Sequence, residues 1–266
     1  MEFTVSLGQM HVVLGDPAAN LAKVEQMTAE AARRGSEVVV FPELWSTGYD
    51  LKNASRYASE LDEGIFAEIA ALARANRIHI FGSNLSLLSP GRYGNTAAFF
   101  SPDGLLLGHY SKAHLFRLMD EHQYLTAGDS LGLVDLPWGR AGLAVCYDLR
   151  FPELFRACAL AGASMVFLPA EWPHPRLAHW QILLRARAIE NQMFIIACNR
   201  VGQSGADTFF GHSCVIDPAG EALLEAGDAE ALLTVQLQMD KVDQIRKNIP
   251  VFQDRRSDVY NLTWIV

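Results

Sequence analysis

The stretch Gly142-Leu-Ala-Val-Cys-Tyr-Asp-Leu-Arg150, followed by Phe151-Pro-Glu-Leu154, decides how the chain is organised. Four small or apolar residues lead into Cys146, and a polar turn then leads into Pro152, which suits the first turn of a helix. This pattern predicts a buried strand with a cysteine at its carboxyl end, the edge where open α/β sheets carry their chemistry. Near helix N–H groups, such a cysteine can be held as a thiolate. Most buried cysteines are instead small core residues, and the rest of the chain decides between the two roles.

The overall composition is that of a soluble globular protein. Half of the 266 residues are apolar and 20% are charged, which is enough apolar material for a full core. No linker rich in Pro, Gly or Ser divides the chain, so a single domain is predicted over residues 1–266. The net charge is −8 and no Lys/Arg cluster goes beyond pairs, so a nucleic-acid partner is not expected.

Several features of the sequence predict a cytoplasmic protein. No apolar run approaches the length of a membrane span, so no membrane partner is expected. The start Met1-Glu-Phe-Thr-Val5 lacks the basic and apolar regions of a signal peptide. The four cysteines include no CxxC pair, which argues against a zinc or redox site and favours reduced thiols. Three of these cysteines are expected in the core: Cys158, Cys198 and Cys214.

Apolar residues recur at strand and helix spacing through the first third of the chain. Strands are predicted over 3–9, 37–41 and 78–84. One helix is predicted from Asp16-Pro17 or Asn20 as far as Gly35, and a second over 64–76. The resulting β-α-β-α-β order implies a parallel sheet with helices packed outside it.

The remaining elements repeat this pattern after two hairpins. Hairpins are predicted for 95–101 with 105–110 and for 131–136 with 140–146, around turns that contain Gly104 and Gly139. Helices over 152–161 and 176–191 then alternate with strands over 165–169 and 194–199. A hairpin of 209–216 with 222–226, a strand over 232–237, a helix to Lys247 and a tail from Pro250 complete the chain. Each half is thus βαβα-β-hairpin, which predicts an α/β fold of two mixed sheets stacked face to face, with helices outside.

Three titratable residues stand at comparable places, each after a predicted strand. Glu43 and Cys146 follow buried strands, and Lys112 follows a hairpin arm, so all three could meet at one rim of the sheets. Together they form a workable nucleophilic site: the cation lowers the thiol pKa and stabilises an oxyanion, while the carboxylate moves a proton. A thioester formed from an amide is then cleared by water. Taken alone, Glu43 could be a structural acid and Lys112 a solvated lysine.

The candidate residues lie in the segments Phe41-Pro-Glu-Leu44, Tyr110-Ser-Lys-Ala-His-Leu-Phe116 and Cys146-Tyr-Asp-Leu-Arg-Phe-Pro-Glu153. In order and separation these segments resemble the three signatures of the nitrilase superfamily of carbon–nitrogen hydrolases. The resemblance extends over nearly the whole chain, through Pro169-Ala-Glu-Trp172, Arg187-Ala-Ile-Glu190 and Arg256-Ser-Asp-Val-Tyr260. One signature would be weak, but three in order are specific.

This resemblance implies a four-layer αββα sandwich, in agreement with the two halves of the sequence. It implies a triad in which Glu43 is general base and acid, Lys112 is an oxyanion donor and Cys146 is the nucleophile. The backbone N–H of Tyr147 would be a second oxyanion donor. A supporting glutamate in the following loop would be Glu121, with Asp120 as an alternative. No metal or organic cofactor is implied, and a homodimer or higher homo-oligomer is expected, through the helix after the nucleophile and the late long helix.

Within the superfamily, residues 112–123 and 146–153 are most similar to the ω-amidase branch. Those enzymes release ammonia from short dicarboxylic monoamides such as 2-oxoglutaramate and 2-oxosuccinamate, whose far carboxylate needs a cation or donors. Arg150 is the first candidate and Tyr49 a second donor, while Trp172 would form an apolar wall and Arg176 a weaker cation. Arg150 could instead be a structural partner of Glu153.

Other functions remain open from the sequence. The segment Glu171-Trp-Pro-His-Pro-Arg176 differs from many ω-amidases, which leaves an aliphatic amidase, an N-carbamoyl amino-acid hydrolase or a nitrilase as alternatives. A non-catalytic binding protein or a redox-sensing thiol protein is a further alternative. No histidine is needed as a base if Glu43 acts, which applies to His114, His122, His174 and His179. No glycine-rich phosphate loop is present.

Overall fold

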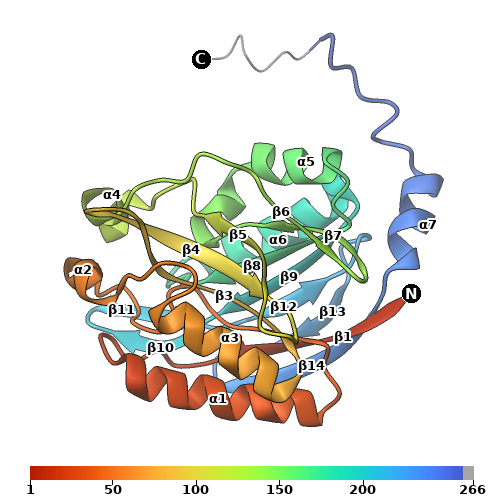
Figure 1. The fold of residues 1–266 in the computed structure, drawn as a ribbon. Helices are drawn as coiled ribbons and strands as arrows, with labels where there is room; N and C mark the ends of the chain where they lie inside the picture. Colours follow the sequence, from red (N-terminus) through yellow and green to blue (C-terminus); the bar gives the residue numbers. More distant parts are fainter. Residues whose placement is uncertain (260–266) are drawn as a thin grey trace.

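Two six-stranded mixed sheets form the centre of the molecule (Figure 1). The computed structural model describes residues 1–259, so Tyr260 of the last similar segment lies outside the described residues. The first sheet has the order β14-β1-β2-β3-β4-β5: Ala231–Gln238, Glu2–Gln9, Val38–Val40, His79–Ser89, Arg92–Phe100 and Leu106–Ser111. The second has the order β13-β12-β9-β8-β7-β6: Ala222–Glu225, Cys214–Ile216, Phe194–Asn199, Met165–Ala170, Gly139–Leu143 and Gly132–Leu136.

The two sheets repeat one topology, as the sequence predicted. In the first sheet β1, β2 and β3 are parallel, and β4 and β5 follow as antiparallel neighbours. In the second, β7, β8 and β9 are parallel, and β12 and β13 follow in the same way. An antiparallel strand completes each sheet, β14 beside β1 and β6 beside β7. The predicted αββα architecture is confirmed.

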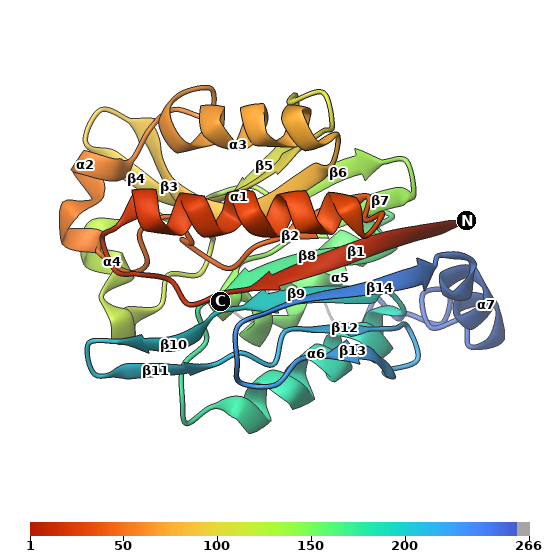
Figure 2. The ribbon, with the colours of Figure 1, turned by 90° about the horizontal axis from the view of Figure 1, so that it is seen from below.

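Helices cover the outer faces of both sheets. Figure 2 shows α1 (Pro17–Arg33) and α3 (Gly64–Asn76) on one side of the stacked sheets and α6 (Leu177–Asn191) on the other, where α5 (Pro152–Leu160) contacts it. The first helix begins at Asp16, whose side chain accepts a hydrogen bond from the N–H of Ala19 at 3.1 Å, a typical N-cap. Further α-helices are α2 (Ala54–Tyr57), α4 (Glu121–Tyr124) and α7 (Asp240–Asn248).

Apolar alternation along the strands builds the two sides of the core. Val38 and Val40 face the second sheet, whereas Val39 between them packs under the helices. Between the sheets, the rings of Phe81 and Phe99 lie 5.5 Å and 5.1 Å from that of Phe167. This packing fixes the relative position of the strand ends where the candidate residues lie.

Two predicted strands differ from the structure. The predicted strand 140–146 ends at Leu143, and Cys146 starts a short 3-10 turn, Cys146–Arg150. The predicted strand 209–216 is broken, because Gly211 and His212 adopt φ angles of 70° and 51°, which no strand contains. Its first part, β11 (Asp207–Phe210), pairs with the unpredicted β10 (Val201–Ser204) in a separate ribbon.

Candidate active site

The three predicted catalytic residues meet at one edge of the sheets. Glu43 follows β2, Lys112 follows β5 and Cys146 follows β7, so each lies just beyond the carboxyl end of a strand. Glu43 and Lys112 are fully buried, and Cys146 is only 4% exposed. The expected meeting of these three side chains at one rim is therefore observed, and their catalytic roles stay predictions.

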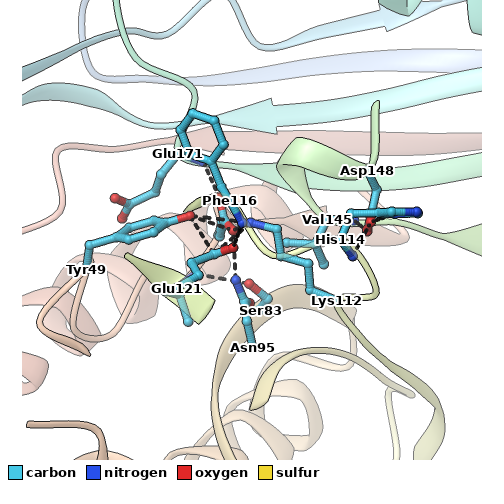
Figure 3. Close-up of polar contacts among 12 residues, drawn as sticks. Tyr49, Ser83, Asn95, Lys112, His114, Phe116, Glu121, Val145, Asp148 and Glu171 are labelled. Carbon is cyan, nitrogen blue, oxygen red and sulfur yellow. Dashed lines mark hydrogen bonds and ion pairs between the residues drawn. The ribbon is translucent and has the colours of Figure 1, made fainter. Parts of the chain in front are cut away.

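Glu43, Lys112, Tyr49 and Glu121 form a closed ring of hydrogen bonds. The Lys112 ammonium donates to Oε1 of Glu43 at 2.8 Å and to Oε1 of Glu121 at 2.7 Å. The Tyr49 hydroxyl lies 3.0 Å and 2.9 Å from the same two oxygens. Figure 3 shows Tyr49, Lys112 and Glu121 converging on one point. An ammonium has three protons. Beyond these two short bonds, Lys112 makes only a long hydrogen bond of 3.5 Å to the Tyr49 hydroxyl, so its third N–H can turn to a stronger acceptor.

The two carboxylate oxygens of Glu43 have different surroundings. Oε1 accepts from Lys112, Tyr49 and the side-chain amide of Asn95, which donates at 2.7 Å. Oε2 accepts from the backbone N–H of Glu171 at 2.8 Å. Oε1 is therefore saturated, and Oε2 keeps the capacity to accept a proton.

Glu121, rather than Asp120, belongs to the cluster. Its Oε2 accepts a hydrogen bond from the backbone N–H of Phe116 at 2.5 Å, in addition to the bond from Lys112 to Oε1. Asp120 is exposed and points its carboxylate at Gln123 instead. The segment after Lys112, which was expected to be a loop, thus contains a short helix, α4, that brings Glu121 inward.

Burial and charge set the protonation of the site. Burial alone would lower the pKa of Lys112, but the charges of Glu121 and Glu43 outweigh it and raise that pKa well above its usual value. Burial raises the pKa of the Cys146 thiol well above its usual value, and the charge of Glu43 adds to the effect against the opposing charge of Lys112. The expected lowering of the thiol pKa by Lys112 is therefore outweighed, and this environment favours the neutral thiol of Cys146.

The turn that carries Cys146 has a strained backbone. Cys146 has a φ angle of 45°, in the left-handed region that non-glycine residues rarely adopt. The side chain of Asp148 folds back within the turn and accepts a hydrogen bond from the N–H of Val145 at 2.8 Å. Strain of this kind persists only where the surroundings fix it, and it occurs frequently at functional sites.

Cys146 opens on a small pocket. Arg150 and Arg176, two of the predicted substrate contacts, both line it, as do Tyr147 and Trp172. The Arg150 guanidinium lies 4.8 Å over the Trp172 ring and donates a hydrogen bond to Nδ1 of His179 at 3.3 Å. The remaining lining residues are Phe116, Glu171 and Pro173.

Two predicted contacts differ from this geometry. Tyr49 was expected to donate to the substrate, but its one hydroxyl proton is taken up between Glu43 and Glu121, so it orders the cluster instead. Arg150 was given Glu153 as an alternative partner, yet among residues 1–259 no ion pair joins them. Arg176 likewise has no carboxylate partner in this range, and its guanidinium lies 5.8 Å over the Phe116 ring.

A buried ion pair beneath the pocket was not predicted. Glu171 and Arg200 are both almost fully buried, and Nη1 of Arg200 donates to Oε2 of Glu171 at 3.0 Å. Oε1 of Glu171 has no hydrogen-bond partner within the described chain. Burial raises the pKa of Glu171 to about 7, against the opposing charge of Arg200. The signal in the sequence was one of position: Arg200 directly follows the predicted strand over 194–199, and Glu171 lies two residues beyond the predicted strand over 165–169.

Over residues 1–259, no group of three or more His, Cys, Asp and Glu side chains is arranged to hold a metal ion. In the same range no helix combines the length and the apolar character that crossing a bilayer requires.

A buried Glu–Lys–Cys cluster at the strand ends of an αββα sandwich defines a cysteine-dependent hydrolase. The carbon-nitrogen hydrolase family model matches residues 4–247, and the chain belongs to that family. It is 39% identical to a 2-oxoglutaramate amidase of Bacillus subtilis, over 98% of this chain and 100% of that protein. It is 33% identical to the human (Homo sapiens) omega-amidase, over 91% of each chain.

A solved structure agrees with the fold. XC1258 from Xanthomonas campestris, a CN-hydrolase superfamily protein with an arsenic adduct in its active site, superposes with a TM-score of 0.90. The two sequences are 31% identical, over 97% of this chain and 98% of that one. The chain is therefore a nitrilase-type enzyme that hydrolyses carbon–nitrogen bonds.

Proposed function

We propose that this enzyme is an ω-amidase that hydrolyses the terminal amide of short dicarboxylic monoamides such as 2-oxoglutaramate. The observation that carries the proposal is the pocket itself, in which the thiol of Cys146 shares the walls with Arg150 and Arg176. Within the described residues neither arginine is paired with a carboxylate, so both are available to a substrate carboxylate. The names of the similar proteins from Bacillus subtilis and Homo sapiens support this substrate class.

The first step forms a thioester. Because Cys146 rests as a thiol, its proton must leave as the sulfur attacks the amide carbon. Glu43 takes that proton on Oε2, the oxygen with spare capacity. A new C–S bond forms, and the carbonyl π electrons move to the oxygen as an oxyanion.

Two donors stabilise the oxyanion. The remaining N–H of Lys112 and the backbone N–H of Tyr147, directly after the nucleophile, are the donors we assign. Lys112 is held rigidly by Glu43 and Glu121, at 2.8 Å and 2.7 Å, so little reorganisation is needed as charge develops.

Collapse of the oxyanion breaks the C–N bond. Glu43 returns the proton to the leaving nitrogen, which departs as ammonia. A water molecule then gives a proton to Glu43 and attacks the thioester carbon, and the sulfur leaves with a proton from Glu43. The cycle restores the thiol of Cys146 and the carboxylate of Glu43.

A substrate panel with ammonia detection tests the proposal. We expect the highest kcat/KM for 2-oxoglutaramate or 2-oxosuccinamate, lower values for neutral amides and none for nitriles. Denatured reaction mixtures should contain an acyl adduct on Cys146, and Cys146→Ala should release no ammonia. Preference for a neutral amide or a carbamoyl compound would overturn the substrate class, and full activity of Cys146→Ala would overturn the mechanism.

The raised pKa of Cys146 argues against a redox-sensing role, which needs a ready thiolate.

We also propose that the enzyme forms a homodimer through α5 and α6. These helices expose three large apolar side chains to solvent, which a contact with a second subunit would bury. Their exposed fractions are 47% for Leu160, 66% for Ile182 and 53% for Ile189. Light scattering should give twice the chain mass, and Ile182→Glu should lower it. A monomer at micromolar concentration would refute the proposal.

We propose a cytoplasmic location. All four cysteines are unpaired, which suits a reducing compartment, and Cys146 needs to stay reduced to act. Fractionation of cells that express the natural protein tests this directly, and recovery outside the cytoplasm would contradict it.

A further inference from the structure

Asp148 is a fully buried carboxylate that the proposed reaction does not use directly. It accepts four hydrogen bonds. Oδ2 accepts from the N–H of Val145 at 2.8 Å and from the Tyr110 hydroxyl at 2.9 Å. Oδ1 accepts from His114 twice, from Nδ1 at 2.7 Å and from the backbone N–H at 3.2 Å. Asp148 has this complete set of donors although it makes no hydrogen bond with Glu43, Lys112 or Cys146 within the described chain, and that arrangement requires an explanation.

These donors come from two segments that meet only in the folded protein. Val145 immediately precedes the nucleophile, whereas Tyr110 and His114 stand two residues before and two residues after Lys112. Figure 3 shows His114, Val145 and Asp148 as a group beside the Lys112 side chain. Asp148 therefore ties the arm that carries the lysine to the turn that carries the cysteine.

His114 holds the same turn at its other end. Its ring stacks on Phe151, with centroids 3.6 Å apart and planes inclined by 7°. Phe151 directly follows the 3-10 turn, and the Asp148 carboxylate lies within it. A histidine whose Nδ1–H is bound to Asp148 and whose face is covered by Phe151 contacts the turn at two places.

We infer that Asp148 and His114 are positioning residues that hold Cys146 at the correct distance from Lys112. This inference rests on the proposed function and names a requirement of the same site. The left-handed backbone of Cys146 is strained and needs outside support. The Asp148 carboxylate supplies that support through its hydrogen bond with the N–H of Val145. His114, on the segment that carries Lys112, donates a hydrogen bond to this carboxylate and so holds it in place. Neither residue touches the reacting atoms, so each acts through the geometry of the nucleophile and the oxyanion donor.

Paired substitutions of His114 separate positioning from folding. His114→Leu keeps an apolar contact with Phe151 but removes the Nδ1 donor. His114→Asn presents a side-chain N–H at nearly the same place as Nδ1 and restores the donor. The control is His109→Asn, on β5 and five residues before His114, because His109 is exposed. For the best amide substrate we expect His114→Leu to lose about 10²-fold in kcat with little change in KM, the typical result of a misplacement near 1 Å.

A second measurement does not depend on turnover. The rate at which iodoacetamide alkylates Cys146, followed by mass spectrometry, should fall in His114→Leu and return toward the wild-type rate in His114→Asn. A merely structural role predicts lower thermal stability with unchanged kcat per intact site, and alkylation that is unchanged or faster. Either result for folded His114→Leu, or a His114→Asn protein no better than it, overturns the inference. If the wild-type enzyme releases no ammonia from any amide, the proposed function fails, and the alkylation rates alone decide the positioning role.

Discussion

Replacing Arg150 by methionine tests how the pocket selects its substrate. Arg150 has no ion-pair partner within residues 1–259, and its contacts are the Trp172 ring at 4.8 Å and His179 at 3.3 Å. A substrate carboxylate would therefore accept a charge-assisted hydrogen bond from Arg150. Such a bond contributes about 1.5–3 kcal/mol, which corresponds to about a 10- to 150-fold loss in kcat/KM at about 1.4 kcal/mol per factor of ten. Methionine keeps the apolar stem against Trp172, so the loss reports the charge.

The assay compares two substrates in the same variant. Ammonia release from 2-oxoglutaramate should fall by the factor above, while release from a neutral amide of similar length should stay near the wild-type rate. Arg74→Met, an exposed arginine on α3, controls for the loss of a positive charge remote from the pocket. Equal losses on both substrates would refute the reasoning and assign Arg150 a structural role. A loss confined to the acidic substrate in Arg176→Met instead would transfer the role to that residue.

Three further predictions concern the buried cluster. Lys112→Ala should lower kcat by about 10²–10³-fold or more, with a smaller change in KM, because its third N–H acts on the oxyanion; a large rise in KM at normal kcat would contradict this. Tyr49→Phe removes a donor shared by two buried carboxylates, and urea unfolding should report a loss of about 1.5–3 kcal/mol; unchanged stability would contradict it. Burial raises the pKa of Glu171 from 4.5 to about 7, so the folded state binds its proton more tightly. The free energy of unfolding gains about 3 kcal/mol from this tighter proton binding. The gain is fully present below pH 4.5 and disappears as the pH rises through about 7. Thermal unfolding of Glu171→Gln should lack this decline, and identical pH profiles for variant and wild type would exclude it.

Much of the fold follows from local patterns in the sequence. The helix over 64–76 and the strand over 194–199 match the structure at both ends, because each lies between clear end signals. The break at Gly211 and His212 was missed because the residues on both sides have strand character. Only the tertiary pairing of β11 with β10, outside the main sheets, shows where one strand ends and the next begins.

The site was predicted as a set of side chains and not as a network. Glu43, Lys112 and Cys146 were predictable because each follows a strand and carries a distinctive group. Asn95 was not, because a strand asparagine looks ordinary until its contact with Glu43, 52 positions away, is known. The role of Asp148 was hidden for the same reason, since its donors come from two segments. Contacts between distant segments depend on how the sheets stack, and local patterns do not encode that.

The charges buried around Cys146 explain why the enzyme uses a thiol and a base instead of a resting thiolate. Three carboxyl groups and two cations lie in this region, all almost fully buried: Glu43, Glu121, Glu171, Lys112 and Arg200. If all are ionised, the group already has one net negative charge, and a thiolate would add a second without water to solvate it. Transfer of the thiol proton to Glu43 during attack leaves the net charge unchanged and moves negative charge onto the substrate oxygen beside Lys112. The excess negative charge of this buried group would also repel the carboxylate of an acidic amide substrate. Such a substrate therefore needs Arg150 and Arg176, the two arginines at the pocket wall, in order to bind.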